Sequence, residues 1–184
     1  MLLFLGVSVA LASAASEQEL VAPCGSALEP KDLDGVIGPE WDDAARHELR
    51  MGRYNAVICL KHGEAQFYIA MIVYTQREFP RGFEAYAVFD NGDGLDFSKG
   101  DDMLLVRAED GALREADYYY AATYNFQPDQ AGGGQINAYG AGRFDRAGGC
   151  YVFEMMRDIA SGDTRDVPLS DEKTVISVYG WASY

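Results

Sequence analysis

Basic residues are scarce in this sequence. Its 184 residues include 15 Lys and Arg against 29 Asp and Glu, so the formal net charge is -14. Nucleic-acid binding needs Lys and Arg gathered on one face to neutralise phosphates, and no such group occurs here. The same shortage disfavours anionic membrane surfaces as partners. An acidic composition of this kind instead favours solubility and the binding of divalent cations.

Catalytic motifs are absent. The sequence contains no G-x-S-x-G, no H-E-x-x-H and no arrangement of Cys and His typical of an activated nucleophile. The glycines of YGAGR at 139–143 lack the strand and helix that flank a dinucleotide-binding loop. A pair of carboxylates for glycoside hydrolysis is not excluded by the sequence, because such a pair is recognised by its distance in the folded protein and not by its spacing along the chain. We therefore expect a protein that is not an enzyme.

Cysteine is also scarce, and the three present are Cys24, Cys59 and Cys150. They do not have the spacing of a zinc site, and they are too few for a disulfide scaffold. Cys59 lies within the apolar run AVICL and is expected to be a small buried side chain. In an exported protein one bridge can form, and Cys24 with Cys150 is then the predicted pair, although sequence does not fix connectivity.

Long apolar runs are missing as well. The run Leu2–Ala12 is too short to span a bilayer, and Ala12-Ser13-Ala14 has the small-x-small form of a signal peptidase site. No Lys or Arg precedes Lys31, so the positive start of a signal peptide is lacking, and a buried N-terminal strand is the alternative. We predict cleavage after Ala14 or Ala15 and a secreted, extracellular or cell-surface protein without a transmembrane segment in the mature chain.

The predicted organisation is a signal peptide over 1–14, an N-terminal extension over 15–32 and one domain over 33–184. Short runs rich in Val, Ile, Tyr and Phe are separated by turns containing Gly, Asp and Pro, which predicts an all-β fold, an antiparallel β-sandwich with little helix. The expected strands are 56–60, 66–75, 83–89, 103–108, 116–124, 136–142, 150–156 and 174–182.

Three segments carry finer expectations. Both alternating faces of 66–75 are apolar, which is typical of a central strand covered on both sides. The stretch PEWDDAARHEL at 39–49 allows one short helical turn with Pro39 at its first position. The stretch QPDQAGGG at 127–134 predicts an exposed, flexible loop.

An acidic loop, FDNGDGLDFSKGDD at 89–102, holds the densest group of carboxylates. Its members are Asp90, Asp93, Asp96, Asp101 and Asp102. Neighbouring carboxylates repel one another unless a cation or many donors compensate. Glycines permit the tight curvature that a cage of carboxylate oxygens needs, so we predict bound Ca²⁺ in this loop. The alternative is a solvated loop whose Asp side chains bind its own backbone.

Four motifs resemble, in this order, those of the DOMON-like superfamily. They are LDGVIGPEWDDA at 33–44, AVICLKHGEAQFYIAMIV at 56–73, the acidic loop, and YVFEMMRDIASGDTRDVPLSDEKTVISV at 151–178. The sequence looks nearest to family 9 carbohydrate-binding modules and to the haem-carrying subunit of ethylbenzene dehydrogenase. The resemblance implies an immunoglobulin-like or jelly-roll sandwich that binds a sugar or a haem, or serves as an extracellular module.

Sugar binding in the family uses exposed aromatic side chains. Tyr118 and Tyr120 share one face of a predicted strand, and Tyr124 and Trp181 are the further candidates for a ligand site. Trp41 is expected in the core instead. A glycan is therefore the first candidate ligand, although the chain lacks a clear pair of exposed Trp residues.

Haem binding would need two axial ligands, and no C-x-x-C-H is present for covalent attachment. The candidate ligands are Lys61, His47, His62, Met71, Met103, Met155 and Met156. No two of them form a convincing pair. We expect a non-catalytic, carbohydrate-binding module with a structural Ca²⁺. A b-type haem electron-transfer domain and a calcium-stabilised cell-surface structural protein are the alternatives.

Overall fold

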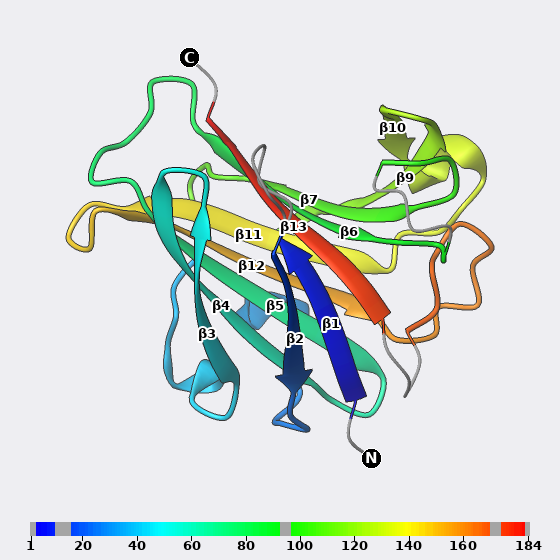
Figure 1. Cartoon of the computed structure of the whole chain (residues 1–184), viewed down its shortest axis with the longest axis horizontal. Helices are drawn as coiled ribbons and strands as arrows, with labels where there is room; N and C mark the ends of the chain where they lie inside the picture. The colour runs from blue at the N-terminus through cyan, green and yellow to red at the C-terminus, as the bar shows by residue number, and fades with distance from the viewer. Residues whose placement is uncertain (1–2, 10–15, 93–96, 170–173, 183–184) are drawn as a thin grey trace.

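The computed structural model describes residues 3–9, 16–92, 97–169 and 174–182, and it confirms the predicted β-sandwich. Two antiparallel sheets pack face to face (Figure 1). The seven-stranded sheet has the order β10-β9-β7-β6-β13-β1-β2. Its strands are β1 Leu3–Val9, β2 Ser16–Ala22, β6 Phe83–Phe89, β7 Asp102–Arg107, β9 Asp117–Ala122, β10 Asn125–Pro128 and β13 Thr174–Ala182.

The six-stranded sheet has the order β3-β4-β5-β12-β11-β8. Its strands are β3 Ala45–Met51, β4 Tyr54–His62, β5 Gln66–Tyr74, β8 Arg114–Glu115, β11 Ala138–Asp145 and β12 Cys150–Asp158. β5 lies between β4 and β12, as its two apolar faces predict. Phe67, Ile69 and Met71 point from it into the space between the sheets. In this core the ring of Phe83 from the other sheet stacks on the ring of Tyr151 of β12, with the two ring centroids 5.1 Å apart.

The outer face of the six-stranded sheet is covered by the segment 24–44, which passes behind β4 and β5 in Figure 1. Trp41 is fully buried there, as expected, and its indole nitrogen donates a 2.7 Å hydrogen bond to Glu154 of β12. The other carboxylate oxygen of Glu154 accepts from the backbone N–H groups of Asp34 and Gly35. Burial is the main reason that the pKa of Glu154 is raised.

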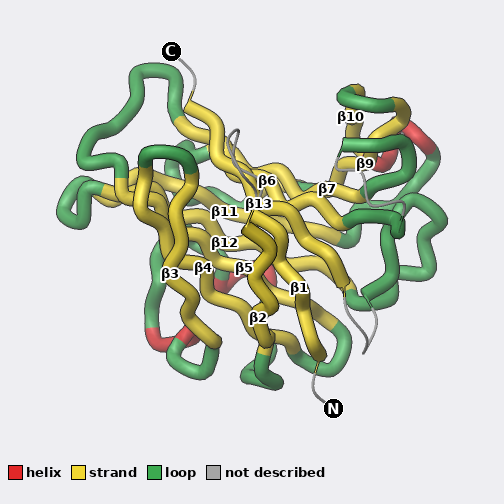
Figure 2. Tube along the Cα trace, viewed as in Figure 1, coloured by secondary structure: helices red, strands yellow, loops and turns green. Residues whose placement is uncertain are grey.

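Helix is limited to short 3₁₀ turns at Pro30–Asp32, Pro39–Trp41 and Asp129–Gly132 among the described residues (Figure 2). The turn predicted from Pro39 therefore forms, but it ends after Trp41. The rest of that stretch enters β3, where every second side chain from Ala45 to Met51 is half-buried or buried. This alternation lets β3 cover the edge of β4.

The N-terminal residues Leu3–Val9 form β1, which pairs in parallel with β13 and antiparallel with β2. The signal peptide over 1–14 stays a prediction. Leu28 packs in the same cluster as Leu33 and Trp41, so the segment before residue 33 is part of the packed molecule. Within the described part of the chain, no helix is both long enough and apolar enough to cross a bilayer.

The predicted disulfide between Cys24 and Cys150 is not formed, and all three cysteines are free. Cys24 pairs with His62, which lies opposite Phe67 of β5, whereas Cys150 lies opposite Tyr74 at the other end of β5. Seven residues of strand span about 23 Å at ~3.3 Å per residue. A disulfide requires Cα atoms within about 7 Å, so this fold separates the two thiols.

Candidate functional site

The acidic loop does not gather its described carboxylates into one site. Asp90 accepts a 2.7 Å hydrogen bond from the backbone N–H of Gly92. Asp101 is buried and accepts from the N–H groups of Ser98 at 2.8 Å and Asn91 at 3.2 Å. These contacts are those of the alternative reading, in which Asp side chains bind the loop's own backbone. Asp93 and Asp96 lie outside the described residues.

Asp102 points the other way, into the space between the sheets. Asp101 precedes β7 and accepts hydrogen bonds from the loop's own backbone, whereas Asp102 is the first residue of β7. Asp102 is fully buried and forms an ion pair with Arg157 of β12, which is equally buried. Arg157 also donates to the backbone oxygen of Val167. Sequence analysis placed Asp102 in the loop; the structure instead places it in an interior ion pair between the sheets.

Asp102 belongs to an acidic cluster, which we define as Asp102, Asp117, Asp129, Asp163 and Asp166. One carboxylate oxygen each of Asp102, Asp117 and Asp166 lie within 4.8 Å of one another. The cluster forms where β7 and β9 begin, next to the 3₁₀ turn after β10 and the connection after β12. These segments lie at the same end of the sandwich in Figure 1.

Several oxygens at the acidic cluster are buried without a hydrogen-bond partner. They are Asp117 Oδ1, both carboxylate oxygens of Asp129, and the side-chain oxygen of Asn137. Only 1% of Asp129 and 4% of Asp117 is exposed. Buried polar groups are normally hydrogen-bonded, so four unpartnered acceptors in one place require a physical reason.

Burial and mutual repulsion raise the carboxyl pKa values in the acidic cluster. The pKa of Asp129 rises to about 7 because of burial and then of Asp117, Asp166 and Asp163. The pKa of Asp117 rises to about 6, again mainly through burial, although the N–H of Asn137 opposes the shift. Burial also raises the pKa of Asp102, against the effect of Arg157. The positive charge of Arg157, which is paired with Asp102, therefore does not offset the burial and the mutual repulsion of these carboxyl groups.

A pocket of about 430 Å³ opens beside the acidic cluster, at the edge of the seven-stranded sheet. It is lined by Leu113, Arg114, Glu115, Asp117, Tyr118, Pro128, Asp129, Gln130 and Ile136. Its lining is mixed, with charged side chains of both signs. The loop expected at 127–134 is in fact partly ordered, because Asp129 begins a 3₁₀ turn and is buried.

The predicted aromatic residues lie on the outer face of the seven-stranded sheet. Tyr118 and Tyr120 both contact Phe126 of β10 edge-on, at centroid distances of 5.8 and 5.9 Å. Tyr120 and Tyr124 contact Phe97, which follows the acidic loop's undescribed residues. Tyr118, Tyr120 and Tyr124 therefore form one aromatic group. Its rings mostly pack against one another, although Tyr124 is well exposed.

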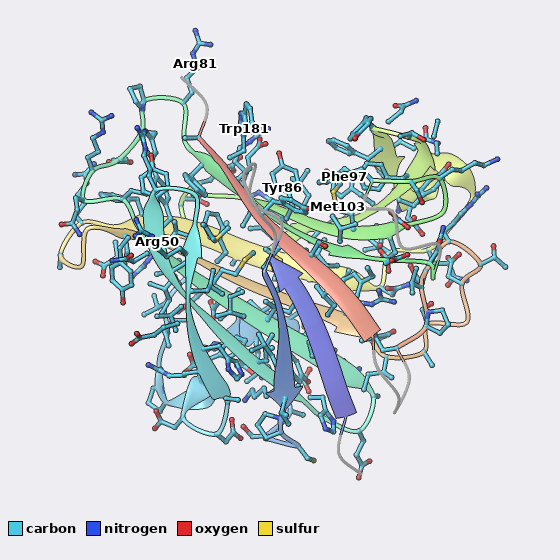
Figure 3. The ribbon with its side chains drawn as sticks, in the orientation of Figure 1. Arg50, Arg81, Tyr86, Phe97, Met103 and Trp181 are labelled. Carbon is cyan, nitrogen blue, oxygen red and sulfur yellow. The ribbon has the colours of Figure 1, made fainter. Side chains whose placement is uncertain are left out.

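Trp181 lies on the same outer face but further along β13, and 66% of it is exposed. Its neighbour across the strands is Glu84, which lies opposite Arg107. Arg107 Nε donates a 2.8 Å hydrogen bond to Glu84. Figure 3 shows Trp181, Tyr86 and Phe97 on the side of the sheet that faces away from β4 and β5.

The methionines considered for haem lie in three separate packing clusters. Lys61 is engaged with Asp43 and Ser26. Met71 and Met155 pack in the core between the sheets. His62 Nδ1 donates a 2.8 Å hydrogen bond to the backbone oxygen of Gly63, and neither His47 nor His62 lines the pocket beside the acidic cluster.

Comparison with known proteins adds no assignment: no family model matches the chain, and no curated protein matches it. Of the acidic cluster, only Asp102 was predicted from the sequence as a site residue. In the sequence, Arg157, Asp158, Asp163, Arg165 and Asp166 bring charges of both signs into one short stretch, which favours an interpretation as a surface loop of balanced charge. That interpretation is wrong for Arg157, which is buried against Asp102. The signal available in the sequence was an Asp at or near the ends of several separate strands.

Proposed function

We propose that this chain is an exported, non-catalytic binding module of DOMON-like type, and that its ligand is a carbohydrate. The observation that carries the proposal is Trp181, a large apolar side chain that lies exposed on a flat sheet face. Sugars present apolar C–H faces that stack on such rings, with hydroxyl groups around the rim that need polar partners.

The surroundings of Trp181 support stacking combined with hydrogen bonding. Tyr179 follows the same face of β13, and it lies opposite Tyr86 of β6. Tyr86 donates a hydrogen bond to Glu84, and burial together with this carboxylate raises the pKa of Tyr86. Glu84 and Arg107 thus offer a carboxylate and a guanidinium beside the indole ring. All these side chains extend from strands, which hold them more rigidly than loops would.

The test is glycan binding by the purified protein and by Trp181→Ala, measured on a polysaccharide array and then by calorimetry with the best ligand. We expect affinity to fall at least about tenfold, because truncating a central aromatic anchor costs ~2 kcal/mol or more. Tyr74→Ala is the matched control, since Tyr74 is an exposed aromatic residue of the other sheet. Equal binding by the wild type and Trp181→Ala would exclude this face as the site.

A further inference from the structure

We propose that the acidic cluster binds a divalent cation, with Ca²⁺ as the best fit, through Asp117, Asp129, Asp166 and the side-chain oxygen of Asn137. Asp102 contributes from the far side, where it is shared with Arg157. This site differs from the acidic loop, with which it has only Asp102 in common. It is also independent of the carbohydrate proposal, because Trp181 lies elsewhere on the seven-stranded sheet.

The unpartnered oxygens provide the ligands. Asp102, Asp117 and Asp166 each offer one oxygen within 4.8 Å of the others, and Asp129 and Asn137 add buried oxygens that have no hydrogen-bond partner. Ca²⁺ takes about six to eight oxygens, from carboxylates and from amide carbonyls, in adaptable geometry. A cation of this kind would coordinate the buried oxygens that receive no hydrogen bond from any described residue.

Asn137 is oriented for this role by its own hydrogen bonds. Its backbone N–H donates to Asp117 Oδ2 at 2.8 Å, and its side-chain nitrogen donates to Asp166 Oδ2 at 2.5 Å. Since the nitrogen is directed at Asp166, the amide oxygen is left as a buried acceptor. One residue therefore positions two of the carboxylates and adds a neutral ligand of its own.

Asp129 lies next to Asp163, at a place where the chain has a glycine. A side-chain carbon at Gly134 would overlap Asp129 Oδ2 and would lie 3.1 Å from Asp163 Oδ2, so these two carboxylates meet above a glycine. The backbone N–H of Gln135 donates to Asp163 Oδ2 at 2.5 Å. Asp129 itself receives no such bond, although it is almost completely buried.

The two arginines near the site contact groups other than Asp117 and Asp129. Arg157 is directed at Asp102 and Val167. Arg165 lies 4.7 Å from the ring of Tyr119 and donates to the backbone oxygen of Gly132. Neither guanidinium is placed to donate to Asp117 Oδ1 or to Asp129. A bound cation is thus the compensation that the geometry calls for, and it would join β7, β9 and the turn after β10 to the connection after β12.

The test uses the full chain, freed of metal with a chelator, and two readouts. Thermal unfolding is followed as free Ca²⁺ is raised, and Tb³⁺ luminescence excited through tyrosine reports occupancy, since Tyr119 lies beside Arg165 near the cluster. At Ca²⁺ about 100-fold above its dissociation constant we expect the melting temperature to rise by about 5–10 °C. Ca²⁺ should also displace Tb³⁺.

Asp129→Asn and Asp117→Asn are the test variants, and Asp90→Asn in the acidic loop is the matched control. We expect both cluster variants to lose the Ca²⁺-dependent shift and most of the Tb³⁺ signal. Without metal, they should melt at the wild-type temperature or above it, because each removes a repelled buried charge. Asp90→Asn should respond as the wild type does. The proposal is overturned if Ca²⁺ does not raise the melting temperature of the wild type, or if the response survives in Asp129→Asn and Asp117→Asn.

Discussion

Lys61 is a fully buried ammonium group that the segment 24–44 holds in place. Its Nζ donates to Ser26 Oγ at 3.1 Å and to Asp43 Oδ1 at 2.9 Å, and it lies 5.6 Å from the ring of Trp41. Burial acts to raise the pKa of Asp43, but the backbone N–H of Ser26 and the Lys61 ammonium outweigh it and hold the pKa at about 2. The ionised form of Asp43 is therefore the one that stabilises the fold.

Asp43 makes the stability of the fold depend on pH in the acidic range. Its pKa is lower in the folded chain than its ordinary value of 3.8, so its contribution is present above about pH 4 and is lost as the pH falls toward about 2. We expect Asp43→Asn to lower the free energy of unfolding at pH 7 by about 1 kcal/mol, since Asp43 is partly exposed. That difference should disappear near pH 2.

The measurement is urea unfolding of the wild type and Asp43→Asn from pH 7 to pH 2. Asp42→Asn is the matched control, because Asp42 is an exposed neighbour. A difference between wild type and Asp43→Asn that stays constant down to pH 2 would contradict the assignment of the stabilising charge to Asp43.

At the scale of elements, the segment 24–44 covers a sheet face that would otherwise expose apolar side chains. Trp41 joins the segment to β12 through Glu154 and packs beside Tyr68 and Cys59. We expect Trp41→Ala to destabilise the fold by about 3–5 kcal/mol. Trp41→Phe should cost less, about 1–3 kcal/mol, because it mainly removes the hydrogen bond to Glu154.

Trp181→Ala provides the comparison within the same chain, since one Trp is buried and the other is exposed. Its free energy of unfolding, from denaturant titration, should stay within about 0.5 kcal/mol of the wild type. Similar losses for Trp41→Ala and Trp181→Ala would show that the segment does not stabilise the sheet as described.

Strands with strong apolar runs could be predicted from the sequence. The bounds expected for 83–89 and 174–182 coincide with β6 and β13, and the two-sided apolar pattern of 66–75 identified β5 as central. β3 was missed because its residues ARHELRM include good helix formers, and only its pairing with β4 makes it a strand. The acidic cluster could not be predicted, since Asp102, Asp117 and Asp129 come close only through the pairing of β7, β9 and β10, and Asp163 and Asp166 join them from the connection after β12.

At the scale of the whole molecule, the fold holds together without a disulfide among the described residues. Its three thiols are free, and Cys24 and Cys150 lie at opposite ends of the six-stranded sheet. We expect the melting temperature to be the same with and without a reducing agent. Loss of a bridge would instead lower it by about 5–15 °C.

Calorimetry of the oxidised and reduced protein, with Cys24→Ser and Cys150→Ser alongside, checks this prediction. Neither variant should change how the melting temperature responds to the reducing agent. A drop on reduction that Cys24→Ser and Cys150→Ser both abolish would mean that the two thiols do pair, and that the arrangement of Cys24 beside His62 is wrong.

As long as the predicted signal peptide is not cleaved, the parallel pairing of β1 with β13 affects the order in which the chain folds. Leu5 lies opposite Thr174, so the contact joins the first strand to the last, and β13 also pairs with β6. The entropy of closing such a long loop is lost before the contact can stabilise anything, which makes pairings of this kind slow. On the ribosome, the hairpin of β1 and β2 must wait for β13 to be synthesised. Closing the seven-stranded sheet is therefore a late event in folding.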